Sequence, residues 1–158
     1  VATAYLRSDI AHSLAGFGFL VPKKERRKIL GSLFSSSMFE GRAPAGTVLL
    51  TSFVGGLRNP ELTAQSDAGI AQLVQGELES LVGARGEPQW LAITRWTHAI
   101  PQYNLGHRER LRPVEAAERA LPGLFFCANY RGGVSVGDCI KSAHAMADTV
   151  SRFVSSAR

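Results

Sequence analysis

The chain has 158 residues, a formal net charge of +5 at pH 7, 45% hydrophobic residues and 20% charged residues. These values fit one soluble globular domain and exclude a disordered chain, and no apolar run approaches the length of a transmembrane helix. The first residue is Val1, with neither an initiator Met nor a charged-then-apolar leader. We therefore expect a fragment or a trimmed piece whose core is completed by something absent.

The N-terminal third of the sequence predicts an antiparallel sheet. Four strand-like runs occupy residues 1–10, 16–21, 29–35 and 47–54. The last run is the clearest, because it is rich in β-branched residues and stops at two glycines. Consecutive strands with short connections are typical of antiparallel pairing.

A basic cluster, Lys23–Lys28, lies between the second and third of these runs. Such a cluster can bind nucleic acid or an anionic membrane. No aromatic residues interleave with it, and it connects two apolar runs. We expect a solvated connection and no nucleic-acid partner.

The period of the apolar residues changes to that of a helix over residues 62–82. Thr63 and Ser66 are candidate N-caps, and Gly83 is a plausible stop. The pattern predicts an amphipathic helix that covers one face of the sheet.

Further elements are predicted from Trp90 onward. Strand character returns over residues 90–96, and Pro101 breaks any regular element after it. Pro113 can open a short helix, since proline is favoured at the first helical position.

The most distinctive stretch runs from Leu124 to Val150. An apolar run over residues 124–128 predicts a buried strand, residues 129–133 a glycine turn, and residues 138–154 an amphipathic helix. At such a corner, free backbone N–H groups and the positive end of a helix dipole face outward together. The corner suits an anionic or electron-rich ligand; the alternative is a tight connection without a ligand.

No hydrolytic or metal-binding constellation is present. The sequence has no GxSxG and no HExxH, and its four histidines are scattered. We expect His107 and His144 to be surface or satisfied histidines and Asp138 to be a helix-start carboxylate. We assign no catalytic residue and no metal ligand.

The two cysteines, Cys127 and Cys139, do not form a zinc pattern and are too few for a disulfide framework. Both fall on predicted apolar faces. We expect buried free thiols in a reducing compartment, which favours a cytoplasmic protein.

Two strings make the sequence specific: RWTHAIPQYNLGH over residues 95–107 and LPGLFFCANYRGGVSVGDCI over residues 121–140. Together they resemble the C-terminal part of the protoporphyrinogen oxidase family, FAD-dependent enzymes of haem biosynthesis within the amine oxidase and phytoene desaturase superfamily. The resemblance extends from about residue 16 to residue 153.

The resemblance implies a flavoprotein oxidoreductase that oxidises protoporphyrinogen IX or coproporphyrinogen III to the porphyrin, with oxygen or another acceptor reoxidising the FAD. The flavin carries the chemistry, so the lack of an acid–base constellation does not argue against an enzyme. The family also implies a peripheral membrane association of the full-length enzyme as an alternative to a purely cytoplasmic one.

The resemblance also implies the residues of the site. Residues matching family positions beside FAD are Trp96, Gly133, Val134, Ser135 and Val136, and Ile100 matches a position near the substrate pocket. One departure is mild: Ala128-Asn129 stands where relatives often have Gly-Asn.

A larger departure concerns the ADP half of FAD. The family binds it through an N-terminal GxGxxG unit, and this chain has none. We therefore expect an inactive C-terminal third that needs a missing N-terminal FAD-binding half or another copy of the chain.

The expected fold class is α+β. Residues 1–87 would form part of an antiparallel substrate-domain sheet with its covering helix. Residues 88–158 would supply the C-terminal strand and helix of a Rossmann-like FAD-binding domain. Two alternatives stay open: another amine-oxidase-like flavoenzyme, and a non-catalytic fragment or subunit that binds a partner chain.

Overall fold

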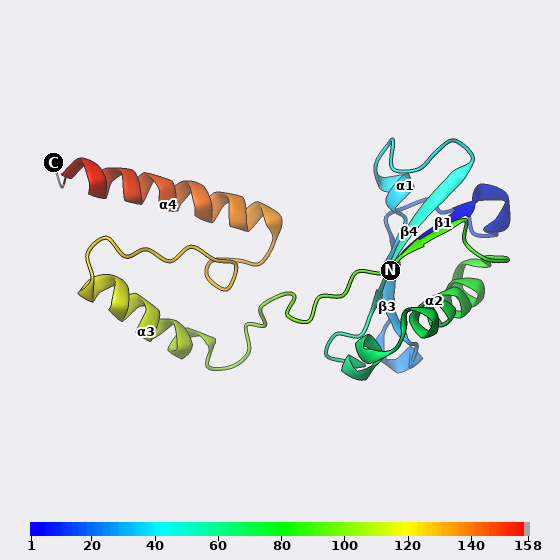
Figure 1. Cartoon of the computed structure of the whole chain (residues 1–158), viewed down its shortest axis with the longest axis horizontal. Helices are drawn as coiled ribbons and strands as arrows, with labels where there is room; N and C mark the ends of the chain where they lie inside the picture. Colours follow the sequence, from blue (N-terminus) through cyan, green and yellow to red (C-terminus); the bar gives the residue numbers. More distant parts are fainter. Residues whose placement is uncertain (157–158) are drawn as a thin grey trace. The chain divides into compact units, whose positions relative to one another are not determined.

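The structure is a computed structural model that describes residues 1–156. The chain forms two compact units, Val1–Arg95 and a second that begins at Trp96 (Figure 1). Strand β5, which the sequence assigned to the second region, pairs with β1 in the first unit. The division thus falls eight residues after the predicted boundary.

The first unit is built on one five-stranded sheet with the order β2-β3-β4-β1-β5. Every neighbouring pair of strands is antiparallel, as predicted. The strands are β1 (Ala2–Leu6), β2 (Gly18–Leu20), β3 (Ile29–Leu33), β4 (Thr47–Val54) and β5 (Trp90–Ala92). Short helical turns are η1 (Arg7–Asp9), η2 (Lys23–Glu25), α1 (Ser35–Met38) and η3 (Pro60–Ala64).

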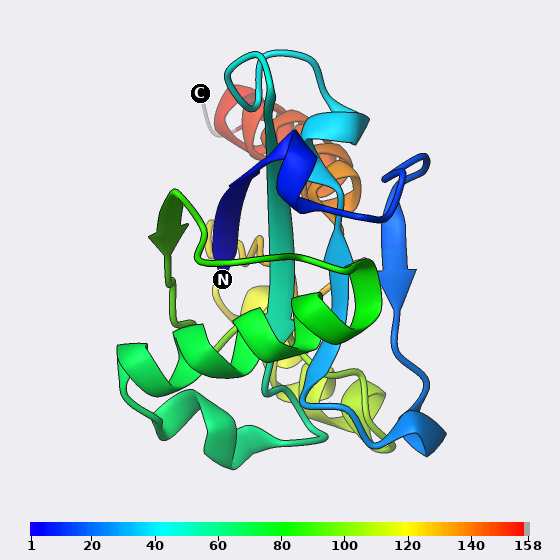
Figure 2. The ribbon, with the colours of Figure 1, turned by 90° about the vertical axis from the view of Figure 1, so that its right-hand side faces the viewer.

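Helix α2 (Asp67–Val82) lies across one face of this sheet (Figure 2). Its buried residues, Ile70, Val74, Leu78 and Val82, recur every four positions and so form one apolar stripe. The helix begins later than predicted because residues 60–64 form the separate turn η3. Its N-cap is Ser66, whose hydroxyl accepts the Gly69 N–H at 3.2 Å, and it ends at Gly83, which has a φ of +64°.

The core lies between α2 and the sheet. Alternate residues of β1 and β4 face α2, so Tyr5 and Leu50 are almost fully buried beside the helix stripe. Burial raises the pKa of the Tyr5 phenol. The buried hydroxyls of Ser32 and Ser52 satisfy each other at 3.1 Å.

The basic connection is solvated, as expected from its sequence. Five of its six residues are exposed, and Arg27 is half-buried. The Arg27 guanidinium donates to Ser80 at 2.8 Å and pairs with Glu77 on α2. The Lys28 N–H also donates to Glu77, at 3.1 Å. These bonds give the cluster a structural role at the sheet edge.

The second unit contains helix α3 (His107–Ala120) and helix α4 (Val136–Ser156). The prediction that Pro113 opens a helix is wrong, since Pro113 lies inside α3. Its fixed φ is helical, and it removes only one backbone hydrogen bond from a segment of good helix formers. Helix α4 begins two residues earlier than predicted.

Residues 124–128 do not form a strand, which corrects the sequence prediction. A β-strand needs a neighbour to complete its ladder, and no strand pairing involves this run within the described residues 1–156. The apolar composition alone was therefore insufficient.

None of the described residues 96–156 is fully buried, and neither long helix of the second unit has a buried residue. Within the described part of the chain, no helix combines the length and the apolarity needed to cross a membrane.

Candidate functional site

The glycine turn and the first turn of α4 form a corner, defined here as residues 129–138. Ser135 is the residue just before α4, and its hydroxyl accepts the Asp138 N–H at 3.0 Å. The same hydroxyl donates to the Asp138 carboxylate at 2.6 Å. This reciprocal arrangement caps the helix, so Asp138 is the helix-start carboxylate that the sequence predicted.

Gly133 has a backbone conformation that suits only glycine. Its φ is +133°, and a Cβ there would lie 2.6 Å from the Asp138 carboxyl group. Any side chain at position 133 would therefore break the Ser135–Asp138 cap. The sequence requires glycine here for the local fold, independently of any ligand.

A tyrosine from the preceding loop holds the two ends of the turn together. The Tyr103 hydroxyl donates to the Asn129 carbonyl at 2.9 Å and accepts the Gly133 N–H at 3.1 Å. One side chain thus bonds both residues that flank the turn. The two strings singled out in the sequence therefore meet in space.

His107, the first residue of α3, makes a second contact with the turn. Its Nε2 lies 2.9 Å from the Tyr130 carbonyl, which can only accept, so this nitrogen carries a proton. The imidazole also stacks on the Tyr103 ring, with centroids 4.2 Å apart and 12° between the planes. His107 is thus a satisfied histidine, as predicted.

An ion pair fixes the segment before the turn. Arg131 donates through both terminal nitrogens to the two oxygens of Glu118 on α3, each at 2.7 Å. Glu118 also accepts the Phe126 N–H at 2.9 Å. The hydrogen bonds from Arg131 and from Phe126 lower the pKa of Glu118 to about 2. Sequence reasoning missed this pair, because its members lie in different elements with no shared motif.

The side chains that the resemblance placed beside a flavin are exposed. Val134 is 40% exposed and Val136 78% exposed, on either side of the capping Ser135. Trp96 and Ile100 are 73% and 63% exposed, and within residues 1–156 neither makes a hydrogen bond or ring contact through its side chain with the corner. Gly133 to Val136 are consecutive residues of the corner, and the roles that the resemblance implies for Trp96 and Ile100 stay predictions.

Two backbone donors of the corner also lack an acceptor within the described residues. They are the N–H groups of Val136 and Gly137, which begin α4. With the helix dipole they provide a modest positive potential, which Asp138 in the first turn partly offsets. Exposed apolar side chains beside free N–H groups can receive a flat ring whose edge carries acceptors.

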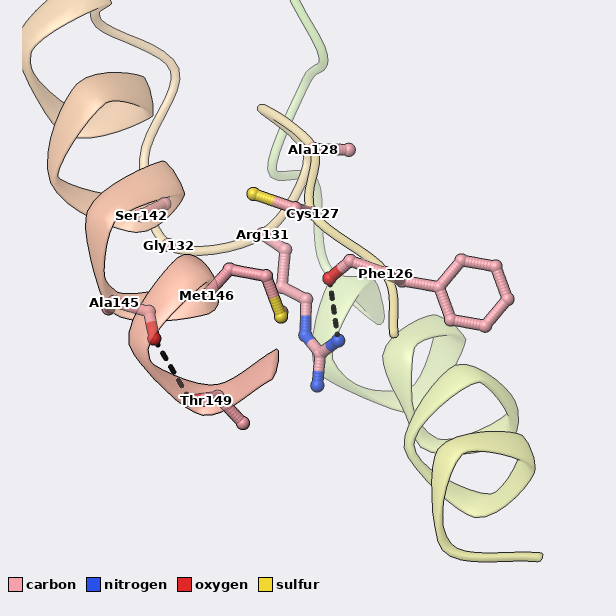
Figure 3. A pocket seen from close by; sticks show the side chains of 9 residues that line it. All are labelled: Phe126, Cys127, Ala128, Arg131, Gly132, Ser142, Ala145, Met146 and Thr149. Atoms are coloured by element: carbon pink, nitrogen blue, oxygen red, sulfur yellow. Dashed lines mark hydrogen bonds between the residues drawn. The ribbon is translucent and has the colours of Figure 1, made fainter. Parts of the chain in front are cut away.

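A pocket of about 280 Å³ lies behind the corner, between α4 and the segment before the turn. Figure 3 shows Arg131 between these two elements, with the Met146 side chain directed toward it. The lining residues are Phe126, Cys127, Ala128, Arg131, Gly132, Ser142, Ala145, Met146 and Thr149. None of the predicted flavin-contacting residues lines it.

The cysteine prediction needs correction. Cys127 is exposed and Cys139 is half-buried, and both are free thiols. The run carrying Cys127 forms no strand, and its residues are half-buried or exposed, so the predicted apolar face is not a buried one. No group of histidine, cysteine and carboxylate side chains within the described residues could hold a metal.

Residues 4–151 match the family model described as flavin containing amine oxidoreductase. The mitochondrial protoporphyrinogen oxidase of Nicotiana tabacum is 42% identical over 159 residues, which cover 99% of this chain and 32% of that protein. The coproporphyrinogen III oxidase of Bacillus subtilis (strain 168) is 28% identical, with 92% of this chain and 31% of that protein covered.

A crystal structure assigned as a protoporphyrinogen oxidase from Exiguobacterium sp. 255-15 superposes with a TM-score of 0.77 at 28% identity, covering 94% of this chain and 33% of that chain. The resemblance stated from the two strings is thus confirmed. The chain spans about a third of the length of the curated relatives it matches.

Proposed function

The chain belongs to the flavin containing amine oxidoreductase family, and we propose that it is the C-terminal part of an FAD-dependent porphyrinogen oxidase. In this proposal its second unit contributes one wall of the flavin site, and its first unit contributes part of the substrate domain. The substrate class is a porphyrinogen, with protoporphyrinogen IX and coproporphyrinogen III as the two members to test.

One observation carries this proposal. IPQYNLGH and GGVSVGD are the strings on which the resemblance rests, and they meet through the Tyr103 hydroxyl, which bonds Asn129 and Gly133. This contact brings the two strings together and supports the proposal that they belong to one site.

The residues present fit a flavin ring. The corner offers the N–H groups of Val136 and Gly137 together with the exposed side chains of Val134 and Val136. When bound, FAD would accept hydride equivalents from the porphyrinogen. The N–H groups would stabilise negative charge at the edge of the ring, and the valines would exclude water from one of its faces.

Trp96 and Ile100 are proposed to contact FAD and the substrate, respectively, as the resemblance implies. Both lie in the irregular segment that opens the second unit, and both are exposed. Exposed apolar side chains in a loop are suited to contact a ligand or another part of the enzyme.

The partner of the second unit is proposed to be the FAD-binding portion that carries the dinucleotide loop. The unit has no fully buried residue among residues 96–156, and its α4 exposes Val136, Ile140 and Val154. Within the described residues the Phe126 backbone is bonded to Glu118 and Arg131, whereas no hydrogen bond involves the backbone of Phe125 or Cys127, which a neighbouring strand can satisfy. The rest of the relatives' length is the natural source of this covering layer.

Reconstitution tests the proposal directly. The chain is combined, in one polypeptide or by co-expression, with the portion of the enzyme that carries GxGxxG. We expect a complex with stoichiometric flavin absorbance that converts a porphyrinogen to its fluorescent porphyrin. Testing protoporphyrinogen IX and coproporphyrinogen III separately identifies the substrate.

Two results would contradict the proposal. A reconstituted complex that takes up no flavin would remove the flavin site. A flavin-loaded complex that oxidises an amine or a carotenoid precursor, but neither porphyrinogen, would favour another branch of the family.

A further inference from the structure

Tyr103 and His107 contact the corner without belonging to it, and we infer that they form a latch. In this latch they act as positioning residues that hold the turn at residues 129–133 in the shape needed to present Gly133–Val136 to the flavin. The inference rests on the proposed function, and it assigns these two side chains a role in ordering the site before the ring binds.

The Tyr103 hydroxyl is bonded on both sides. It donates to the Asn129 carbonyl at 2.9 Å and accepts the Gly133 N–H at 3.1 Å, and so spans the mouth of the turn. Within residues 1–156, no other hydrogen bond involves the Gly133 N–H. Loss of the hydroxyl therefore releases both ends of the turn at once.

His107 restrains Tyr103 and the turn together. Its ring lies flat on the Tyr103 ring at 4.2 Å, while its Nε2 donates to the Tyr130 carbonyl at 2.9 Å. The imidazole thereby fixes the plane in which the tyrosine hydroxyl points. Since His107 starts α3, the latch ties the turn to a helix.

The turn needs such a restraint because of its composition. Gly132 and Gly133 both have positive φ angles, of +88° and +133°, and glycines lose the most backbone freedom on ordering. The surrounding residues are at most half-buried, so apolar packing restrains the turn only in part. Without a restraint, flavin binding would have to order the glycine turn, and the free energy this costs would lower the affinity for flavin.

The test uses the complete flavin-loaded enzyme and the substitution Tyr103→Phe, which keeps the stacked ring and removes only the hydroxyl. We expect the Kd for FAD to rise about tenfold, from the loss of two hydrogen bonds. The visible absorption bands of the bound flavin should shift, because the corner relaxes beside the ring. Amide exchange at Gly133 in the flavin-free enzyme should accelerate by a similar factor.

Tyr5→Phe is the matched control. It makes the same chemical change in the core of the first unit, which includes none of the corner's residues, and within the described residues the Tyr5 hydroxyl makes no hydrogen bond. We expect its Kd, spectrum and amide exchange to match those of the unsubstituted enzyme. Equal effects of the two substitutions would overturn the latch.

His107 is tested by rescue. In His107→Gln the side-chain amide can still donate to the Tyr130 carbonyl, whereas His107→Ala removes both the donor and the stacked ring. We expect a small change in FAD affinity for the first variant and a change close to that of Tyr103→Phe for the second. Equal losses in both variants would show that the hydrogen bond has no role.

Failure of the latch and failure of the proposed function give different results. If the unsubstituted complete enzyme takes up no flavin, the proposed function fails, and the latch is then judged by Gly133 amide exchange alone. If the enzyme binds flavin and Tyr103→Phe changes neither affinity nor spectrum, the latch fails and the proposed function stands.

Discussion

The two units of the chain organise their apolar residues in opposite ways. In the first unit, α2 and the sheet share one core in which Val74, Leu50 and Leu78 are completely buried. In the second unit, two long helices flank a glycine corner, and none of the described residues 96–156 is fully buried. The buried core cluster thus lies entirely in the first unit, and the described residues of the second unit contribute nothing to it.

Polar contacts replace the core in the second unit. The Glu118–Arg131 pair, the Tyr103 hydroxyl and the Ser135–Asp138 cap fix the path of the chain around the corner. Hydrogen bonds of this kind specify geometry but contribute little net stability when exposed. This contrast supports the proposal that the second unit is shaped in advance for a partner, whose apolar surface would then supply its stability.

Separating the units tests this contrast most strongly. Residues 1–95 alone should unfold in one cooperative thermal transition, because the core is contained in them. Residues 96–158 alone should show helical circular dichroism that declines gradually with temperature. A sharp transition in the second fragment would mean that it has a core that the described residues do not show.

A pair of truncations in helices tests the contrast within the intact chain. Leu78→Ala in α2 removes a completely buried side chain and should lower the free energy of unfolding by about 2–5 kcal/mol. Ile140→Ala in α4 removes a side chain that is 56% exposed and should change it by less than about 0.5 kcal/mol. Denaturant titration measures both values.

The effect of Ile140→Ala should be larger in the complete enzyme than in this chain alone. Ile140 would then be covered, and its truncation should become clearly destabilising or weaken association of the parts. If Ile140→Ala changes neither stability nor association in the complete enzyme, the partner does not cover the face of α4 that carries Ile140.

The corner should be sensitive to glycine substitution at one position and tolerant at a near neighbour. Gly133→Ala places a Cβ 2.6 Å from the Asp138 carboxyl group at a φ of +133°, so it should cost about 1–3 kcal/mol locally. Gly137→Ala lies in the first turn of α4, where a Cβ would make an ordinary contact at 3.8 Å from the Ser135 hydroxyl oxygen, and should stabilise the helix by up to about 1 kcal/mol. Helix content and amide exchange in α4 report both effects.

Sequence reasoning succeeded where one face of an element is buried. The helical period, the Ser66 cap and the Gly83 stop predicted α2, and the β-branched run predicted β4. These patterns are visible in the sequence because both elements pack against a core in the same unit. Asp138 was also predicted correctly as a helix-start carboxylate, whereas its capping partner Ser135 was predicted only as a flavin contact.

The errors arise where a residue's environment depends on segments that are distant in the sequence. Residues 124–128 have strand composition but no adjacent strand among residues 1–156, and Cys127 in the same run is exposed for that reason. The Tyr103 contact links residues 26 positions apart through irregular backbone that carries no period. The IPQYNLGH string marked the tyrosine as part of a specific motif, and only the structure gave its partners.

Acid titration gives the smallest expected effect and tests whether the polar contacts hold the second unit. The pKa of Glu118 lies near 2, below its ordinary value of 4.5, so the folded corner favours the ionised carboxylate. Its contribution is fully present above pH 4.5 and is lost as pH falls through about 2. Glu118→Gln should remove this acid dependence while leaving that of the first unit unchanged.

Chemical shifts of the Phe126 and Arg131 amides across this pH range measure the effect, since Phe126 donates to Glu118 directly. In the unsubstituted chain both signals should titrate together with a midpoint near 2. A midpoint at the ordinary value would mean that the Arg131 pair does not persist in solution. The corner would then take its shape only once the covering layer arrives, and the second unit would not be preformed.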